Sequence, residues 1–177
     1  VPAAAPQKYK SLMQKAAQAA GFDSCTVRME STAAAMAYGL ACSAVKNKKQ
    51  TILVFDMGGG TTDITIAENT SDESYHVLQT LGDTHLGGDD MDQALCEWVL
   101  QQHSDLSSTP LLVRKCRDAK IQLCNGAEST YIAIQGRRYT VTNADFETCL
   151  APLLGRVKAL LETSNKVQQK PDEVILI

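Results

Sequence analysis

The sequence lacks several features that would place the protein in other classes. No stretch reaches the ~18 consecutive apolar residues of a membrane-spanning helix, and the N-terminus has neither the basic nor the apolar region of a signal peptide. A formal net charge of −3 argues against a dedicated nucleic-acid or membrane surface. Internal repeats and low-complexity tracts are also absent. The 177 residues, 44% of them hydrophobic, are sufficient for a globular core.

The six cysteines form no Cys-x-x-Cys pair. They are Cys25, Cys42, Cys96, Cys116, Cys124 and Cys149. Their scatter favours small core residues in a reducing compartment over a disulfide framework or a zinc site. We therefore expect a cytoplasmic protein, with an organelle as the alternative if a targeting segment precedes the chain. The abrupt start at Val1 and the strand-like end at residues 173–177 favour a piece excised from a longer protein.

A glycine-rich turn between two apolar runs is the most informative segment. Residues 51–55 and 64–67 predict the two strands of a hairpin, joined through Asp56-Met-Gly-Gly-Gly-Thr-Thr-Asp63. Glycines let backbone N–H groups approach a polyphosphate, and Asp56 and Asp63 are hard ligands suited to hydrated magnesium. Three consecutive glycines between two aspartates favour a phosphate cradle over an ordinary hairpin turn. The segment is neither a P-loop, because no Gly-Lys-Ser/Thr follows, nor a dinucleotide fingerprint, because a strand follows where a helix would be needed.

The rest of the pattern predicts an α/β fold. Helices are expected over 7–20, 31–40, 89–102 and 109–123, with Ser31 or Thr32 as an N-cap of the second. Further strands are expected over 75–81, 130–134, 139–141 and 174–177, and the segments 130–134 and 139–141 are expected to form a hairpin across 135–138. Helix-start residues at 142–147 predict a last helix toward Ser164, interrupted near Pro152 and Gly155. We expect 41–50 to be a solvated linker, 69–74 a turn, and Trp98 a core residue rather than a stacking platform.

The Asp56 to Asp63 hairpin resembles the second phosphate loop of the actin, sugar-kinase and heat-shock ATPase superfamily. Two more stretches, Glu30-Ser-Thr-Ala-Ala-Ala-Met-Ala-Tyr-Gly-Leu40 and Gly82-Asp-Thr-His-Leu-Gly-Gly-Asp-Asp-Met-Asp92, resemble signatures of the heat shock protein 70 chaperone family in order and spacing. The resemblance runs from Val1 to Ile177. It implies an actin-like (ribonuclease H-like) ATPase fold, of which the chain supplies mostly the second lobe: a mixed sheet flanked by helices, plus a smaller α+β subdomain.

The resemblance also implies a division of the chain. Residues 1–40 would end the first lobe and form the crossover helices, and 41–88 would form the large subdomain of the second lobe with the phosphate hairpin. Residues 89–141 would form the small subdomain, and 142–177 the return helix and closing strand of the large one. The family's first phosphate loop and its adenosine loop would then lie outside the chain. We therefore expect ATPase activity in the full-length protein and none in this fragment alone.

Site roles follow from the resemblance position by position. The catalytic positions are Asp56, which would hold magnesium waters near the attacking water, Thr61 beside the γ-phosphate, and Glu30. The metal positions are Asp56 and Asp63. Phosphate contacts would come from Gly58, Gly59, Gly60 and Thr61 and from the pair Gly87 and Gly88. The implied cofactors are ATP or ADP with Mg²⁺, and K⁺ beside it.

The resemblance also implies roles for a relay between the lobes and for a histidine. Pro2, Lys10 and Glu30 match a family relay between the cleft and the lobe interface, with ordinary surface charges as the alternative for Lys10 and Glu30. Lysine replaces the usual arginine there, which removes the bidentate fork. We expect His85 to be structural rather than a metal ligand or base.

The segment 117–124 departs from the family. The family has glutamate, lysine, arginine and serine at positions i, i+3, i+4 and i+7 of a helix face that clamps adenosine. This sequence has Arg117, Lys120, Ile121 and Cys124 there, so only Lys120 is retained as a nucleotide contact. Loss of the arginine removes a stacking partner for adenine, which predicts reduced adenine specificity.

The resemblance implies a stress-response chaperone whose ATPase controls a peptide-binding domain outside the chain. Its partners would be unfolded or nascent polypeptides, J-domain co-chaperones and nucleotide-exchange factors, with no nucleic acid and no membrane. One alternative is a chaperone-like scaffold or co-chaperone that binds nucleotide with little hydrolysis. Another, disfavoured by the motif over 82–92, is a sugar or acetate kinase of the same superfamily.

Overall fold

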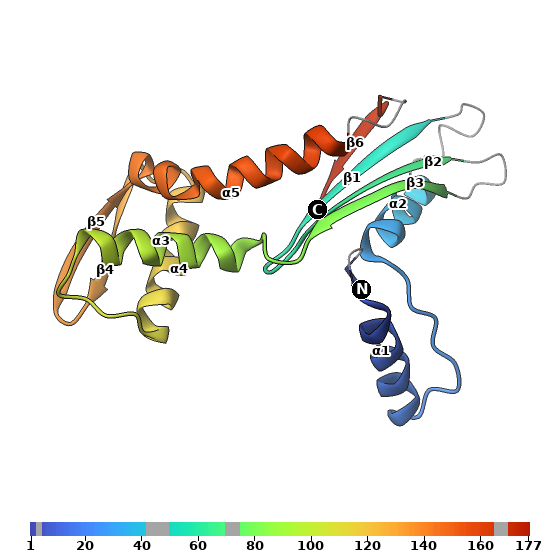
Figure 1. The fold of residues 1–177 in the computed structure, drawn as a ribbon, viewed down its shortest axis with the longest axis horizontal. Helices are drawn as coiled ribbons and strands as arrows, with labels where there is room; N and C mark the ends of the chain where they lie inside the picture. Colours follow the sequence, from blue (N-terminus) through green and yellow to red (C-terminus); the bar gives the residue numbers. More distant parts are fainter. Residues whose placement is uncertain (3–4, 42–49, 70–74, 165–169) are drawn as a thin grey trace. The chain divides into compact units, whose positions relative to one another are not determined.

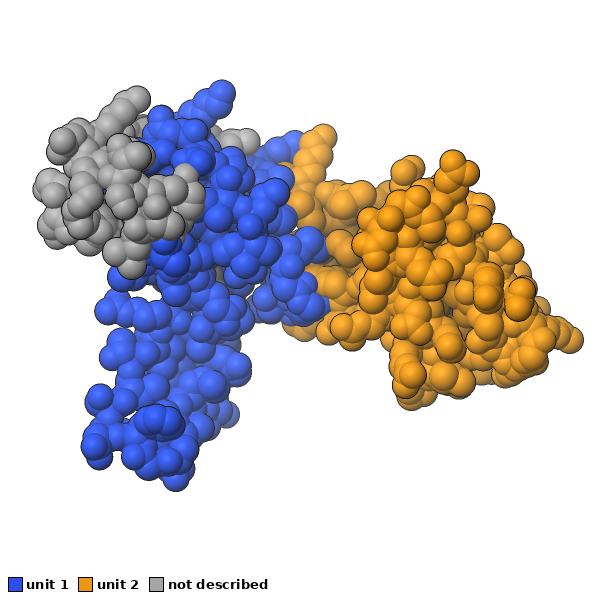
Figure 2. Space-filling view, turned by 180° about the vertical axis from the view of Figure 1, so that it is seen from behind, with its two compact units in different colours: residues 1–84, 159–177 blue, residues 85–158 orange. Residues whose placement is uncertain are grey.

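The computed structural model describes residues 1–2, 5–41, 50–69, 75–164 and 170–177. The expected linker over 41–50 and the turn over 69–74 lie almost wholly outside these ranges, as does Cys42. The chain divides into two compact units, one formed by residues 1–84 with 159–177 and one by residues 85–158 (Figure 2).

The first unit is built on a mixed four-stranded sheet with the order β3-β2-β1-β6 (Figure 1). Its strands are β1 (Thr51–Met57), β2 (Thr62–Asn69), β3 (Tyr75–Asp83) and β6 (Glu173–Leu176). β1 pairs antiparallel with β2 and parallel with β6, and β2 pairs antiparallel with β3. The predicted hairpin, third strand and closing strand are confirmed.

Both faces of this sheet are covered, which explains why residues 52–55 of β1 form a continuous apolar run and why both the apolar and the polar residues of β2 are buried. On one face, Ala35 of α2 (Glu30–Ala41) packs with Ile52, Val54 and Ala67. On the other, Leu53, Ile64 and Ile66 pack with Leu160 and Leu161, near the end of α5 (Asn143–Ser164). Since alternate residues of a strand share a face, Asp56 continues the α2 side of β1 after Ile52 and Val54.

Two helices precede the sheet in the chain. Helix α1 (Gln7–Ala19) confirms the helix predicted over 7–20 and ends before Gly21, whose φ of 93° suits a glycine at a helix terminus. Helix α2 begins at Glu30, so the predicted N-cap at Ser31 or Thr32 is wrong. The Ser31 side chain is fully buried, and its hydroxyl is hydrogen-bonded to Thr65 Oγ1 on β2 at 2.6 Å. Ser31 therefore bonds to the sheet and does not cap the helix.

The second unit packs three helices on a two-stranded sheet. It contains α3 (Gly88–Gln102), α4 (Pro110–Cys124), β4 (Ser129–Ile134), β5 (Arg137–Thr142) and the first part of α5. Its core includes Leu95, Val99, Leu112, Ile132 and Val141. The hairpin turn is shorter than the predicted 135–138. It consists of Gln135 and Gly136 with φ of 51° and 74°, the positive values of a tight two-residue turn.

Helix α5 is continuous, so the predicted interruption near Pro152 and Gly155 is wrong. Pro152 removes a single N–H donor from a helix of 22 residues. The start of the helix is fixed by a reciprocal cap: Asp145 N–H donates to Thr142 Oγ1, and the Asp145 carboxylate accepts from the Thr142 N–H. Phe146 and Leu150 then anchor its first turns in the core.

The cysteine prediction is confirmed in part. Cys96 and Cys116 are buried, and the five described cysteines are free thiols, but Cys124 is exposed and is not a core residue. Within the ranges described, no helix is both long and apolar enough to cross a membrane.

Candidate functional site

The glycine turn between β1 and β2 is open. Met57 pairs with Thr62, which leaves residues 58–61 as the turn, and Gly58 N–H donates to the Thr61 carbonyl at 2.9 Å. Gly58 and Gly60 do not have left-handed φ values, and a Cβ on Gly60 would meet nothing within 4 Å. The only near atom for a Cβ on Gly58 is the Thr61 carbonyl oxygen, at 3.9 Å. The described part of the chain therefore does not itself require glycine at these two positions.

Asp56 and Asp63 are brought together beside this turn. They are directly opposite each other in the β1–β2 pair, so their side chains leave the same face of the sheet. Asp63 is 2% exposed, and Asp56 is half-buried. Burial raises the pKa of Asp56, and the negative charge of Glu30 raises this pKa further. Glu30, the first residue of α2, thus completes an acidic group on the α2 face.

The carboxylates beside the turn suit a hydrated cation better than a metal ion held entirely by protein side chains. Among the described residues, no three Asp, Glu, His or Cys side chains converge as a metal site. Magnesium usually keeps several waters and takes one or two carboxylates plus substrate phosphates. Asp56 and Asp63 match that requirement, and Thr61 lies at the end of the adjoining turn.

The other predicted phosphate contacts lie in the second unit. Gly87 N–H donates to Asp90 Oδ2 at 2.8 Å, at the start of α3. The Lys120 ammonium on α4 donates to the Gly88 carbonyl at 2.7 Å and pairs with Asp92 Oδ1 at 2.6 Å. The structure therefore brings Lys120 to the Gly87–Gly88 pair.

Sequence reasoning missed Asp92 as the residue that holds Lys120. Its signal was present, because an acidic residue four positions after Gly88 falls on the inward face of α3, next to Leu95 and Cys96. The Asp92 side chain is 4% exposed.

The helix face that departs from the family is exposed. Arg117, Ile121 and Cys124 lie on the solvent side of α4, with Ile121 47% exposed, whereas Leu112, Cys116, Ala119 and Leu123 are buried on the other side. The three substituted side chains are thus accessible to a ligand.

The relay residues are not joined in the described structure. Lys10 and Glu30 form no ion pair with each other, and the Pro2 carbonyl accepts from Ala5 N–H. The carbonyl of His85 accepts a hydrogen bond from Arg156 at 2.7 Å, which fits a structural position.

Comparison with known proteins defines the family. The family described as Hsp70 protein matches residues 1–177, so the chain belongs to the heat shock protein 70 family. It is 34% identical over 199 residues to the chaperone protein dnaK of Guillardia theta, covering 100% of this chain and 31% of that protein.

Two further relatives agree. The chain is 34% identical to the chaperone protein DnaK of Thermus thermophilus over 201 residues, covering 100% of the chain and 32% of the relative. It is 35% identical to that of Thermoplasma volcanium over 182 residues, covering 92% and 29%. The chain thus spans about a third of the length of these relatives.

Proposed function

We propose that residues 1–177 form part of the ATP-binding and ATP-hydrolysing domain of a molecular chaperone. The observation that carries this proposal is the open turn over 58–61, in which the described fold does not itself need glycine at Gly58 or Gly60, next to the opposed Asp56 and Asp63. Open space beside glycine N–H groups suits close approach by a phosphate. The chaperone relatives favour this function over a scaffold without hydrolysis.

The proposed site contains backbone N–H groups that would bind phosphate and carboxylates that would hold the metal ion. The N–H groups of Gly59 and Gly60 would donate to phosphate oxygens, whereas Gly58 would supply close approach, because its N–H already donates to Thr61. Asp56 and Asp63 would hold Mg²⁺ through its waters, and this ion would neutralise phosphate charge when bound.

Glu30 and Asp56 would position the attacking water. Since the raised pKa of Asp56 makes its carboxylate a better proton acceptor than an ordinary aspartate, it is the stronger candidate for receiving the proton from that water. Glu30 contributes to the shift through its charge, and Thr61 would lie by the γ-phosphate.

The finer assignments complete the proposal. The fold would be actin-like, with residues 1–40 ending the first lobe, 41–88 and 142–177 forming the large subdomain of the second lobe and 89–141 its small subdomain. Gly87, Gly88 and Lys120 would contact nucleotide from the small subdomain. Unfolded polypeptides, J-domain co-chaperones and exchange factors would be the partners of the full-length protein, and K⁺ would accompany Mg²⁺.

Phosphate release by the full-length protein tests the proposal, since these residues match about a third of the relatives' length. Asp56→Ala should abolish hydrolysis with an unchanged circular dichroism spectrum, and the exposed-loop control Asp23→Ala should retain it. Gly59→Val should weaken ATP binding by obstructing the turn, whereas Gly155→Ala, in open space on α5, should not. Wild-type turnover in Asp56→Ala would refute the assignment.

A further inference from the structure

A buried pair of hydroxyl groups links the start of α2 to β2, the strand that carries Asp63. Ser31 Oγ lies 2.6 Å from Thr65 Oγ1, and both residues are 0% exposed. This distance is at the short end of the range for bonds between hydroxyl groups, and burial keeps water from competing for them. The Thr65 hydroxyl also lies 3.5 Å from Thr80 Oγ1 on β3, so it has a second partner within the sheet. The Ser31–Thr65 bond therefore fixes one point of α2 against the sheet.

The apolar contacts of α2 are less specific than this bond. Ala35 is fully buried, but it packs against β1 and β2 with a single methyl group. Apolar packing is non-directional, whereas a hydrogen bond restricts both distance and angle. At the first residue of the helix, Glu30 N–H donates to the Val1 carbonyl at 2.9 Å, and the Glu30 carboxylate pairs with the Val1 ammonium at 3.4 Å. These two contacts join the turn to residue 1 and not to the sheet, so the Ser31–Thr65 bond supplies a directional contact with β2.

The geometry of the strand places this bond next to the acidic group. Thr65 follows Asp63 by two residues, so the two side chains leave the same face of β2, roughly 7 Å apart along the strand. Asp56 is opposite Asp63 in the β1–β2 pair. On the helix, Ser31 follows Glu30, whose negative charge, after burial, adds to the rise in the pKa of Asp56. A shift of the first turn of α2 along the sheet would therefore move Glu30 relative to both aspartates.

We propose that Ser31 is a positioning residue, whose hydrogen bond to Thr65 holds Glu30 where its carboxylate orients the attacking water together with Asp56. This role rests on the proposed function, in which Glu30 and Asp56 position that water. Ser31 itself touches neither water nor nucleotide and acts through Glu30. Loss of the bond lets the first turn of α2 shift, and a small displacement of a positioning group slows a reaction that depends on near-attack geometry. ATP binding through the glycine turn does not require the bond.

ATP turnover by the full-length protein tests this role. Ser31→Ala and Thr65→Val each remove one hydroxyl of the pair and should lower kcat about tenfold with little change in KM. Thr65→Ser keeps the hydroxyl and should retain kcat near the wild-type value. The double variant Ser31→Ala with Thr65→Val should be no slower than either single variant, because the same bond is lost in all three.

A control variant separates positioning from a general loss of stability. Ser164→Ala removes a hydroxyl of similar burial in the same unit, where it donates to the Leu161 carbonyl at 2.8 Å. None of the residues assigned to the proposed site lies on α5, so this variant should lower the urea midpoint and leave kcat unchanged. A merely structural role for Ser31 would give the same result in Ser31→Ala.

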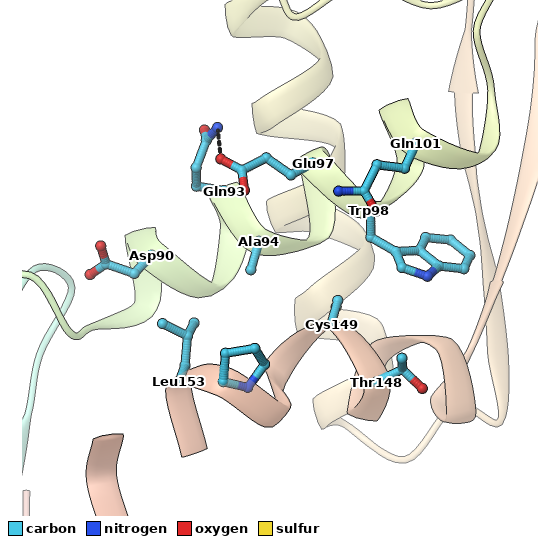
Figure 3. Close-up of a pocket in the computed structure, with 10 residues that line it drawn as sticks. Asp90, Gln93, Ala94, Glu97, Trp98, Gln101, Thr148, Cys149 and Leu153 are labelled. Atoms are coloured by element: carbon cyan, nitrogen blue, oxygen red, sulfur yellow. Dashed lines mark hydrogen bonds between the residues drawn. The ribbon is translucent and has the colours of Figure 1, made fainter. Parts of the chain in front are cut away.

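A second combination shows whether Ser31 acts through Glu30. Adding Ser31→Ala to Glu30→Gln should not lower kcat further, because the group that Ser31 positions has already been changed. The matched control for the loss of a carboxylate is Glu97→Gln, beside the groove between α3 and α5, where Glu97 accepts a hydrogen bond from Gln93 at 3.0 Å (Figure 3). This control should have wild-type turnover.

The possible results separate the two proposals. Absence of hydrolysis by the wild type would overturn the proposed function and the role of Ser31 with it. If the wild type hydrolyses ATP and Asp56→Ala does not, the positioning role alone is overturned by wild-type kcat in Ser31→Ala, by equal kcat in Thr65→Ser and Thr65→Val, or by a further loss when Ser31→Ala is added to Glu30→Gln. Circular dichroism identifies a variant that does not fold, and if that variant is Ser31→Ala, the two Thr65 variants decide the outcome.

Discussion

Replacing Lys120 by methionine should destabilise the second unit severely. The Lys120 ammonium is the charge partner of Asp92, at 2.6 Å, and it also donates to the Gly88 carbonyl. The side chains of Lys120 and Asp92 are 14% and 4% exposed. Methionine keeps the length of the side chain and its helix propensity, so the variant removes the charge and the hydrogen bond with little loss of packing.

The magnitude follows from the burial of Asp92. Removing one partner of a buried ion pair typically costs about 3–5 kcal/mol, because the remaining charge is left unpaired away from water. Since Lys120 is not fully buried, some water can reach Asp92 in the variant, and we expect the lower end, about 3 kcal/mol. Within a domain stability of roughly 5–15 kcal/mol, this is a large fraction.

Urea unfolding without nucleotide, followed by Trp98 fluorescence, measures this loss in the second unit. Arg117→Met, an exposed position on the same helix, is the matched control and should change stability by less than about 0.5 kcal/mol. The double variant Asp92→Leu with Lys120→Met should recover most of the loss, because no buried charge then remains unpaired. The reasoning fails if Lys120→Met costs less than about 1 kcal/mol, or if the double variant is no more stable than the single one.

Three further predictions concern other parts of the chain. The pKa of Asp56 is raised in the folded protein, so its ionised carboxylate destabilises the fold at neutral pH but not below its ordinary pKa. Asp56→Asn should therefore raise the urea midpoint at pH 7 in magnesium-free buffer but not at pH 3. An equal shift at both pH values would contradict this. Hydrogen bonds from Thr142 lower the pKa of Asp145. The stabilisation they give is present above the ordinary pKa of Asp145 and is lost as the pH falls through the pKa of the folded protein. Thr142→Ala should therefore lower the free energy of unfolding by about 1 kcal/mol at pH 7 and by less at pH 2, in the same urea assay. In the full-length protein, Ile121→Arg with Cys124→Ser should tighten ATP binding, measured by calorimetry, by about 1–2 kcal/mol, and unchanged affinity would remove α4 from the adenosine site.

Local patterns predicted most of the elements. Residues 51–55 and 64–67 predicted two strands joined through a glycine turn, and the β1–β2 hairpin has that form. The helix predicted over 109–123 is confirmed as α4, where Pro110 occupies the first turn and the Thr109 hydroxyl accepts from Leu112 N–H. These features are encoded within a few residues of the chain.

Errors arose where a distant contact replaced a local preference. The hydroxyl of Ser31 is a good N-cap in isolation, but it lies against Thr65, 34 residues away. Pro152 breaks many helices, yet α5 continues because its cap and its buried first turns hold it. The pairing of Lys120 with Asp92 likewise depends on the packing of α4 against α3, which no local pattern contains.

The acidic group at the end of the first unit's sheet is costly to the fold. Like charges directly opposite each other in antiparallel strands are destabilising, and Asp56 faces Asp63 while the charge of Glu30 adds to the repulsion. An asparagine or threonine at position 56 would relieve the strain without disturbing the buried strand before it. A bound cation relieves it as well, because a ligand that binds only the folded state adds its binding free energy to stability. The proposed site would account for both the cost of the acidic group and the open glycine turn, because a bound cation would offset the negative charge of Asp56 and Glu30.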